Sequence, residues 1–313
     1  MLESPVVLLF VCAVAAIYLL AACALVRAAL RHAGRAEKAS RGTLLAERAV
    51  LALAAVGVLC FAYGYFVEPY WPEVTHVRIE SARLAGAQRP VRVVHISDLH
   101  CDPVTRLEER LPEIIAAQRP DLIVFTGDSV NSPEGLPVLR KLLPRLASIA
   151  PTFAVRGNWD VWYWGRQELF GGTGVRELNG EAVKVDAAGT SLWVAGAPYA
   201  ATDKIKGALN VVPPGAFTIL LYHTPDEILD VAATKRVDLY CAGHTHGGQV
   251  ALPFYGALVT LSKFGKRYES GLYREGDTWL YVTRGIGMEG DPAPRVRFFA
   301  RPEVSVIELA PPP

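Results

Sequence analysis

The sequence predicts an α/β domain that follows two membrane-spanning helices. Two observations in the 313-residue chain lead to this prediction. Residues 4–26 and 49–67 contain no charged side chain, and a helix of about 20 apolar residues crosses a bilayer. From residue 91 onward, short apolar runs alternate with helical patterns, which favours a domain built on parallel strands. The predicted division is an anchor over residues 1–71 and a folded domain over residues 72–313.

The segment between the two apolar runs predicts their orientation in the membrane. Against Glu37 and Glu47 it carries the basic residues Arg27, Arg31, Arg35, Lys38, Arg41 and Arg48. Because short cytoplasmic loops carry an excess of Lys and Arg, this loop is expected in the cytoplasm and the domain after Trp71 outside it. Two buried core helices are a weaker alternative, since core helices have a polar face. A cleaved signal peptide is the alternative for the first run, although its start, MLESPVV, has no basic residue.

The domain begins with a strand–helix–strand succession. Residues 91–96, 121–126 and 153–155 predict buried strands, and helical patterns over residues 104–118 and 133–149 separate them. This order implies parallel strands joined by right-handed crossovers. Past these elements the chain turns to short strands, which predicts a second sheet with more antiparallel pairing. Those strands are expected at residues 181–185, 191–196, 218–223, 237–243, 279–285 and 304–309.

Charge and cysteine content limit the classes of function. The net charge of the chain is +1, and residues 69–313 hold 26 basic and 27 acidic residues. A nucleic-acid partner is not expected, because nucleic-acid-binding surfaces are strongly basic. Of the five cysteines, Cys101 and Cys241 lie in the domain, which allows at most one disulfide there and no disulfide framework.

Polar clusters follow five of the predicted strands. They are Asp98-Leu99-His100, Gly127-Asp128, Gly157-Asn158, His223 and Gly243-His244-Thr245-His246. Their side chains offer carboxylate, amide and imidazole ligands without thiolate, a set that suits Mn²⁺, Fe or Zn²⁺ better than a structural zinc site. Single histidines of this kind are often core residues, but five clusters at strand ends are hard to explain by packing. The sequence therefore predicts a metal site at the carboxyl ends of the strands.

In this order the clusters resemble the motifs of the calcineurin-like metallophosphoesterases, which are D-x-H, G-D, G-N-H-[D/E], a lone H and G-H-x-H. The segments GHTHGGQ (243–249), LPFYG (252–256) and RFFARPE (297–303) resemble a bacterial membrane-associated branch of that family. The resemblance covers the chain from near residue 90 to near residue 310. It implies a two-sheet sandwich flanked by helices. With the predicted orientation, it also implies a multi-pass protein of the bacterial inner membrane whose catalytic domain is extracytoplasmic.

The resemblance also implies the cofactors and the site residues. Two divalent metal ions, Mn, Fe or Zn, are expected, and together they activate water and neutralise phosphoryl oxygens. The ligands implied for one ion are Asp98, His100 and His246, those for the other are Asn158, His223 and His244, and Asp128 bridges them. The residues expected to carry catalysis are Asp98, Asp128, Asn158, His244 and Asp160. The implied activity is hydrolysis of a phosphodiester or pyrophosphate.

Trp159 departs from the family pattern, which has His after Gly-Asn. An indole N–H donates a hydrogen bond but cannot deliver a proton as an acid, whereas the histidine is expected to protonate the leaving group or stabilise the transition state. Three interpretations are open. The chain is a catalytically weak metal-binding module that recognises a phosphorylated ligand, or another acid such as Asp102 or Asp160 substitutes, or the leaving group needs no acid. The third is favoured, and it predicts that unactivated alkyl monoesters are poor substrates.

Two apolar segments are expected near the metals. One holds Trp159, Trp162, Tyr163 and Trp164, and the other covers residues 252–268. They are interpreted either as local core or as a wall for a lipid-linked phosphate ester, which two membrane helices make plausible. Four arginines are further candidates for phosphate contact, with ordinary solvated surface charges as the alternative. They are Arg156, Arg284, Arg295 and Arg297.

Overall fold

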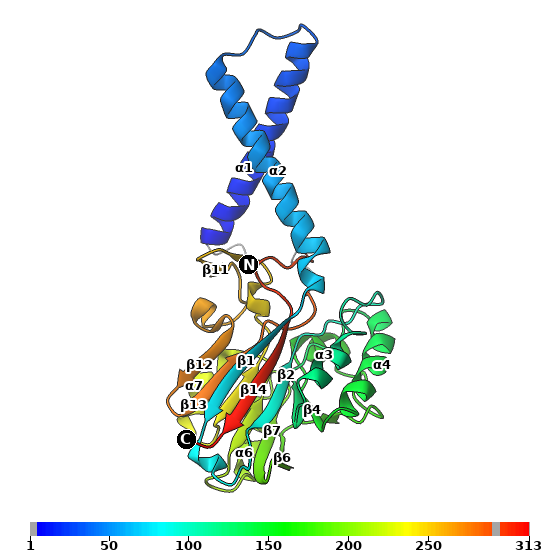
Figure 1. Cartoon of the computed structure of the whole chain (residues 1–313), viewed down its shortest axis with the longest axis vertical. Helices are drawn as coiled ribbons and strands as arrows, with labels where there is room; N and C mark the ends of the chain where they lie inside the picture. Colours follow the sequence, from blue (N-terminus) through cyan, green and yellow to red (C-terminus); the bar gives the residue numbers. More distant parts are fainter. Residues whose placement is uncertain (1–4, 290–294, 313) are drawn as a thin grey trace. The chain divides into compact units, whose positions relative to one another are not determined.

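The computed structural model describes residues 5–289 and 295–312 (Figure 1). The chain divides into two compact units, Met1–Val67 and Glu68–Pro313. The first unit is a pair of helices, α1 (Pro5–His32) and α2 (Arg41–Phe66). In each helix, 11% of the most apolar 18-residue window is buried within the protein. This disfavours the core-helix alternative, because a core helix would be largely covered by its own chain.

Polar contacts near the connection and midway along the helices join α1 to α2. Arg31 Nη2 lies 2.5 Å from Glu47 Oε2, and the Tyr18 hydroxyl donates to the Ala54 carbonyl at 3.3 Å. The N-terminus of α2 is capped by Ser40, whose side chain accepts the N–H of Thr43. Both helices are long and apolar enough to cross a membrane, by length and composition.

The second unit contains two large mixed sheets. The first sheet has the order β1 (Glu73–Glu80), β14 (Glu303–Ala310), β2 (Val91–Ile96), β3 (Leu122–Phe125), β4 (Thr152–Ala154) and β5 (Arg176–Glu177). The second has the order β12 (Gly271–Glu275), β13 (Thr278–Val282), β9 (Leu239–Ala242), β8 (Thr218–Leu221), β7 (Thr190–Gly196) and β6 (Glu181–Ala187). In the first sheet β2, β3, β4 and β5 are parallel, and in the second β7, β8, β9 and β13 are parallel.

The remaining elements connect the strands. The α-helices are α3 (Leu111–Ala117), α4 (Leu136–Ala147), α5 (Asn158–Trp164), α6 (Thr202–Asn210) and α7 (Ile228–Ala233). The 3₁₀ turns are η1 (Glu68–Tyr70), η2 (Ala82–Leu84), η3 (Pro133–Gly135), η4 (Pro225–Glu227), η5 (His246–Gly248) and η6 (Gly265–Tyr268). A short hairpin of β10 (Ala251–Leu252) and β11 (Gly256–Ala257) follows η5.

Three apolar clusters arrange these elements in four layers. Val93 and Val124 of the first sheet pack in one cluster with Ile219 of the second, so the main core lies between the sheets. Because successive side chains of a strand point to opposite faces, Ile123 of β3 lies in a different cluster, with the leucines of α4. The outer face of the second sheet packs against α6 and α7. The predicted two-sheet sandwich flanked by helices is therefore confirmed.

The structure shortens the two predicted helices of the first half. The helix predicted over residues 104–118 is α3, which begins at Leu111 with Pro112 in its first turn. Upstream of it the Glu108 carboxylate accepts the backbone N–H groups of Arg106 and Leu107, which stabilises a turn instead of a helix. Proline is tolerated in a first helical turn because its missing N–H has no helical partner there.

The pairing of the strands differs from the prediction at one important point. The strand expected at residues 304–309 is β14, and it lies in the first sheet, parallel to β1 and antiparallel to β2. The second sheet is antiparallel at its two edges, β12 with β13 and β6 with β7, and parallel between them. Strands β1, β5 and β12 and helices α5, α6 and α7 were not predicted. β1 has no continuous apolar run, and α5 was treated as an aromatic segment.

Candidate metal centre

The predicted site residues lie at the carboxyl ends of five parallel strands. Asp98 and His100 follow β2, Asp128 follows β3, and Asn158 begins α5 directly after β4. From the second sheet, His223 follows β8, and His244 and His246 follow β9. The two sheets thus supply the two sides of one site. This is the edge at which open α/β sheets gather their ligands.

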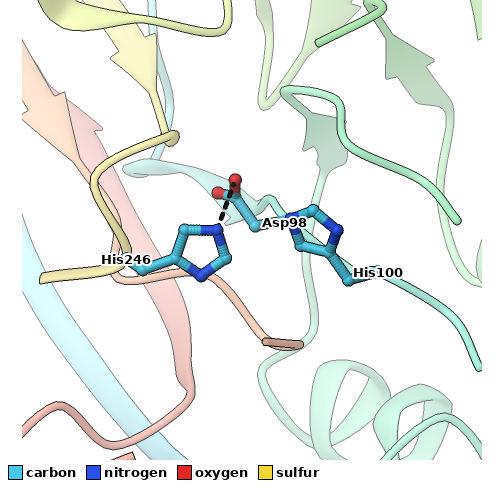
Figure 2. Close-up of side chains that lie close together, drawn as sticks. All are labelled: Asp98, His100 and His246. Carbon is cyan, nitrogen blue, oxygen red and sulfur yellow. Dashed lines mark ion pairs between the residues drawn. The ribbon is translucent and has the colours of Figure 1, made fainter. Parts of the chain in front are cut away.

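Asp98, His100 and His246 form one group that could hold a metal ion, with ligand atoms within 4.8 Å of one another (Figure 2). Nε2 of His246 lies 3.4 Å from Oδ1 of Asp98. The rings of His100 and His246 are 5.1 Å apart between centroids, so two imidazoles approach the same carboxylate. All three residues are buried.

Asp98, Asp128 and His223 form a second group, with ligand atoms again within 4.8 Å of one another. Nε2 of His223 lies 3.2 Å from Oδ2 of Asp128 and 4.0 Å from Oδ1 of Asp98. Nε2 of His100 lies 3.7 Å from Oδ2 of Asp128, so Asp128 reaches residues of both groups. Two adjoining groups that share a carboxylate suit a pair of cations.

Buried atoms without a hydrogen-bond partner mark where ligands are expected. Among the described residues these include Nε2 of His100, Nε2 of His223, Oδ1 of Asn158 and Nδ1 of His246. A buried polar atom without a partner is costly, and a native structure usually compensates it. Divalent cations accept imidazole and carbonyl oxygen ligands of this kind, so the residues fit the two metal ions that the sequence predicts.

His244, the remaining sequence-predicted ligand from the second sheet, lies beside these two groups and belongs to neither of them. It is half-buried, and its ring lies 5.1 Å from that of His223. Its backbone N–H donates to both carboxylate oxygens of Asp98, at 3.2 and 3.1 Å. Its Nε2 lies 3.3 Å from the carbonyl oxygen of Leu261, so the apolar segment 252–268 borders the site.

The carboxyl groups of Asp98 and Asp128 are shifted in pKa in opposite directions. Burial, reinforced by the nearby Asp128, raises the pKa of Asp98 to about 7. At Asp128 burial acts in the same direction, but His223 and His100 outweigh it and lower the pKa. The carboxylate of Asp128 in turn outweighs the effect of burial on His223 and raises the pKa of that imidazole to about 9. The site therefore gathers negative charge, which bound cations would neutralise.

The backbone is strained at five of the site residues. Asp98, His100, Asp128, His244 and His246 all have positive φ angles between 42° and 69°. Such angles cost an L-residue on the order of 1–3 kcal/mol and persist where the surrounding structure enforces them. Gly243 must be glycine, because a Cβ there would lie 2.1 Å from Oγ of Ser97 and 2.3 Å from Oδ2 of Asp98. The chain thus approaches itself closely at the point where the two sheets meet.

Asp160 is placed beside this site as a structural anchor. Its Oδ2 accepts the N–H groups of Asp128 and Gly157, at 2.8 and 3.0 Å, and its Oδ1 accepts that of Ser129 at 2.9 Å. Its side chain is fully buried. Three backbone donors therefore occupy its carboxylate, which fixes the Gly127-Asp128 turn against the start of α5.

Asp102 is also engaged. It forms ion pairs with Arg106, at 2.7 Å, and with Arg295. Burial by itself would raise the pKa of Asp102, but the two arginines outweigh it and lower the pKa, so the residue is an ionised carboxylate near neutral pH. A carboxylate in this state is poorly suited to donate a proton.

Trp159 and Glu289 form a contact that the sequence did not predict. The indole N–H of Trp159 donates to Oε1 of Glu289 at 3.1 Å. The backbone N–H of Trp159 donates to Oδ1 of Asp128 at 2.9 Å, so this pair adjoins the candidate metal site. Glu289 follows no strand and belongs to no motif, and a separation of 130 residues hides the pairing from any local pattern.

Three of the four candidate arginines are used within the fold. Arg156 pairs with Glu177, Arg284 pairs with Glu73 and Glu303, and the fully buried Arg297 donates to backbone carbonyl groups. Arg295 pairs with Asp102 and keeps a partly exposed side chain. Cys101 is a free, buried thiol whose pKa burial raises strongly, which makes it unreactive.

This fold and this site define a metallophosphoesterase. Residues 91–248 match the family described as calcineurin-like phosphoesterase, and the chain belongs to that family. It is a metal-dependent phosphoesterase, a hydrolase, and its family uses two metal ions. The resemblance inferred from the motifs is thereby confirmed.

Similar proteins come from bacteria and from animals. An uncharacterized metallophosphoesterase of Bacillus subtilis, YkuE, is 32% identical over 80% of this chain and 89% of its own length. Phosphodiesterase YaeI of Escherichia coli is 31% identical over 80% of this chain and 92% of its own length. A protein of Danio rerio described as a transmembrane protein with a metallophosphoesterase domain is 28% identical over 84% of this chain and 63% of its own length.

Proposed function

We propose that this chain is a membrane-anchored phosphodiesterase with two divalent metal ions. The observation that carries the proposal is the pair of buried Asp/His groups that share Asp98 at the strand ends. The similarity to Phosphodiesterase YaeI supports a diester substrate. In this proposal residues 1–71 form the anchor and residues 72–313 the catalytic domain.

The proposed ligands include every residue of the two groups and add Asn158 and His244, which neither group contains. The first ion is assigned to Asp98, His100 and His246, the second to Asn158, His223 and His244, and Asp128 lies between them. Two bound cations would supply Lewis-acid neutralisation of the phosphoryl oxygens and activation of a water. The unpaired atoms of His100, His223 and Asn158 support this assignment. Manganese, iron and zinc all suit the donor set.

The chain itself orients these ligands before any substrate arrives. Nδ1 of His100 is hydrogen-bonded to Oδ1 of Asn131 at 2.8 Å, which leaves Nε2 for the site. Nδ1 of His223 is hydrogen-bonded to the carbonyl oxygen of Thr126 at 2.7 Å, with the same result. Asp160 fixes the turn that carries Asp128. Preorganised ligands of this kind are what catalysis through charge stabilisation requires.

Exposed apolar side chains beside the site support an amphiphilic substrate. Phe254 and Leu261 are exposed on the segment that borders His244, and Trp162 and Tyr163 are exposed on α5, which begins with Asn158. Large exposed apolar side chains in water mark binding surfaces when they gather near a site. A lipid-linked phosphodiester presented at a membrane fits them, and the two apolar helices would keep the enzyme at that surface.

The activity is tested with bis(p-nitrophenyl) phosphate and the full-length protein in detergent, loaded with Mn²⁺, Fe²⁺ or Zn²⁺. We expect metal-dependent release of p-nitrophenol that chelation abolishes. D128N should lower kcat by at least ~10³-fold, since the residue contacts both ligand groups. D230N, at an exposed position on α7, is the matched control and should retain activity. Metal binding without turnover by the unmodified protein would contradict the proposal.

The amphiphilic substrate is tested separately with hexadecyl and methyl p-nitrophenyl phosphate in mixed micelles. The long-chain ester should have the lower KM, and a double variant F254S/L261S should raise that KM while leaving the methyl ester unaffected. V211S changes an exposed residue at the end of α6 and serves as the control. Equal KM values for the two esters would contradict the lipid-linked substrate while leaving the phosphodiesterase activity intact.

A further inference from the structure

Glu289 lies one side chain away from the centre of the site. The Trp159 indole N–H donates to its Oε1 at 3.1 Å, and the Trp159 ring stands edge-on to that of His100, 5.3 Å between centroids. Trp159 occupies the position at which the family motif has histidine. Trp159, the residue that replaces the family histidine, therefore itself binds the carboxylate of Glu289.

Glu289 is fixed by the same motif that carries two of the proposed ligands. Its backbone N–H donates to Oε1 of Gln249 at 3.0 Å, and Nε2 of Gln249 donates back to its carbonyl oxygen at 3.2 Å. Gln249 is the last residue of the segment GHTHGGQ, three positions after His246. Met288 directly precedes Glu289, and its carbonyl oxygen accepts a hydrogen bond from Asn131, which also binds His100. The placement of Glu289 is thus coupled to the placement of the site.

The other carboxyl groups near Trp159 are committed elsewhere. Burial raises the pKa of Asp160 to about 6, but both of its oxygens accept backbone N–H groups, and Asp102 is ionised between two arginines. Glu289 is half-buried and has no basic partner among the described residues. Burial raises its pKa and outweighs the hydrogen bond from Trp159, while the charges of Asp128 and His223 act in opposite directions. A carboxyl group in such surroundings keeps its proton to higher pH than usual.

We propose that Glu289 is a catalytic residue, the general acid that protonates the leaving group in place of the histidine that the family has at position 159. Trp159 is its positioning residue, because the indole N–H holds Oε1 and leaves Oε2 to carry the proton. As the phosphorus–oxygen bond to the leaving group breaks, the proton of Glu289 passes to that oxygen. Water supplies the new oxygen on phosphorus and releases a proton to solvent, and the Glu289 carboxylate recovers a proton from water.

This inference rests on the phosphodiesterase function proposed above, and it revises the interpretation that the leaving group needs no acid. The test compares two diesters that differ in the leaving group alone, methyl p-nitrophenyl phosphate and methyl phenyl phosphate. p-Nitrophenolate leaves without a proton, whereas phenolate, a stronger base, benefits from one. In the full-length, Mn²⁺-loaded protein, E289Q should lower kcat/KM for the phenyl ester by ~10²-fold and for the nitrophenyl ester by less than ~3-fold.

A matched control and a rescue variant sharpen the comparison. E113Q removes an exposed glutamate on α3 and should leave both esters unaffected. W159H in the E289Q background restores the family histidine and should recover at least ~10-fold of the activity on the phenyl ester. If the double variant W159H/E289Q hydrolysed the phenyl ester as slowly as E289Q does, a histidine at position 159 and Glu289 would not be equivalent acids.

Three further outcomes would overturn either the role of Glu289 or the phosphodiesterase function. Equal losses on both esters would show that Glu289 is structural, and no loss on the phenyl ester would show that no acid is needed there. Either result overturns the proposal while the activity on the nitrophenyl ester stands. A metal-loaded unmodified protein that hydrolyses neither ester would instead overturn the phosphodiesterase function, and the role of Glu289 with it.

Discussion

The imidazoles of this site are oriented by partners that lie outside the two groups proposed to bind metal. Asn131 is the clearest example, because its Oδ1 accepts from Nδ1 of His100 while its amide nitrogen donates to carbonyl oxygens of His100 and Met288. One amide therefore sets the tautomer of a ligand and the position of the chain that carries Glu289. Residues that orient metal-bound histidines in this way tune the affinity of the site for metal.

Asn131→Ala is expected to weaken metal binding by ~10- to 100-fold, because His100 would lose the partner that fixes its tautomer and ring orientation. The measurement is metal content by mass spectrometry after dialysis against graded free Mn²⁺. Asn179→Ala removes an exposed asparagine that binds Lys204 and is the control. Unchanged metal content in the Asn131 variant would contradict the orienting role.

His95 gives a prediction about pH. It is fully buried, and burial lowers its pKa to about 3, against 6.5 for an ordinary histidine, despite the attraction of Glu303. The folded state therefore binds no proton at His95 between these values, whereas the unfolded state does. Stability is complete above pH 6.5 and is lost as the pH falls toward 3, by roughly 2 kcal/mol at pH 5.

The contribution of His95 is isolated by His95→Gln. Thermal unfolding in detergent at pH 7 and pH 5 should show a larger loss of stability on acidification in the unmodified protein than in the variant. The other groups that face His95, Thr126, Tyr281 and Glu303, are the same in both proteins. Equal losses in the two proteins would mean that His95 is protonated in the folded state.

At the scale of elements, the sequence predicted where the strands that precede the proposed ligands lie, but it did not predict which strands pair with one another. Apolar runs that end in polar clusters located β2, β3, β4, β8 and β9, because a buried strand and its ligand-bearing end are both local features. The position of β14 between β1 and β2 is not local, since an apolar strand fits either sheet by its side chains alone. Glu289 was missed for the same reason, because its partner lies 130 residues away.

The junction between β9 and the first sheet gives a prediction at this scale. Gly243→Ala would place a Cβ against Ser97 and Asp98, at 2.1 and 2.3 Å, so the strand end or Asp98 must shift. We expect metal binding and activity to fall by at least ~10²-fold, because a displacement of about 1 Å suffices for such losses. Metal content and turnover of bis(p-nitrophenyl) phosphate measure the effect.

Gly207→Ala provides the matched control for that substitution. Gly207 lies within α6, and a Cβ there would meet nothing within 4 Å. Alanine in a helix is favoured over glycine by roughly 0.5–1 kcal/mol, so this variant should be fully active and slightly more stable. If Gly243→Ala behaved in the same way, the close approach of the two sheets would not constrain the site.

At the scale of the whole molecule, charge is distributed according to sequence position. The connection between the two apolar helices is basic, whereas residues 69–313 are close to neutral with a slight acidic excess. The neutral domain does not attract polyanions over a distance, so phosphate recognition depends on the local negative site and the cations that it would bind. The basic connection instead bears on the orientation of the helices in a membrane.

That orientation is testable with the full chain fused at its C-terminus to alkaline phosphatase or to green fluorescent protein. The positive-inside rule predicts an active phosphatase and no fluorescence, because the basic loop stays in the cytoplasm and the domain is exported. Replacing Arg35, Lys38, Arg41 and Arg48 with glutamate should weaken or invert this result, since the loop would lose its basic excess. Arg27 and Arg31 stay in place because they pair with Glu47. Fluorescence with an inactive phosphatase would put the domain in the cytoplasm and contradict the predicted orientation.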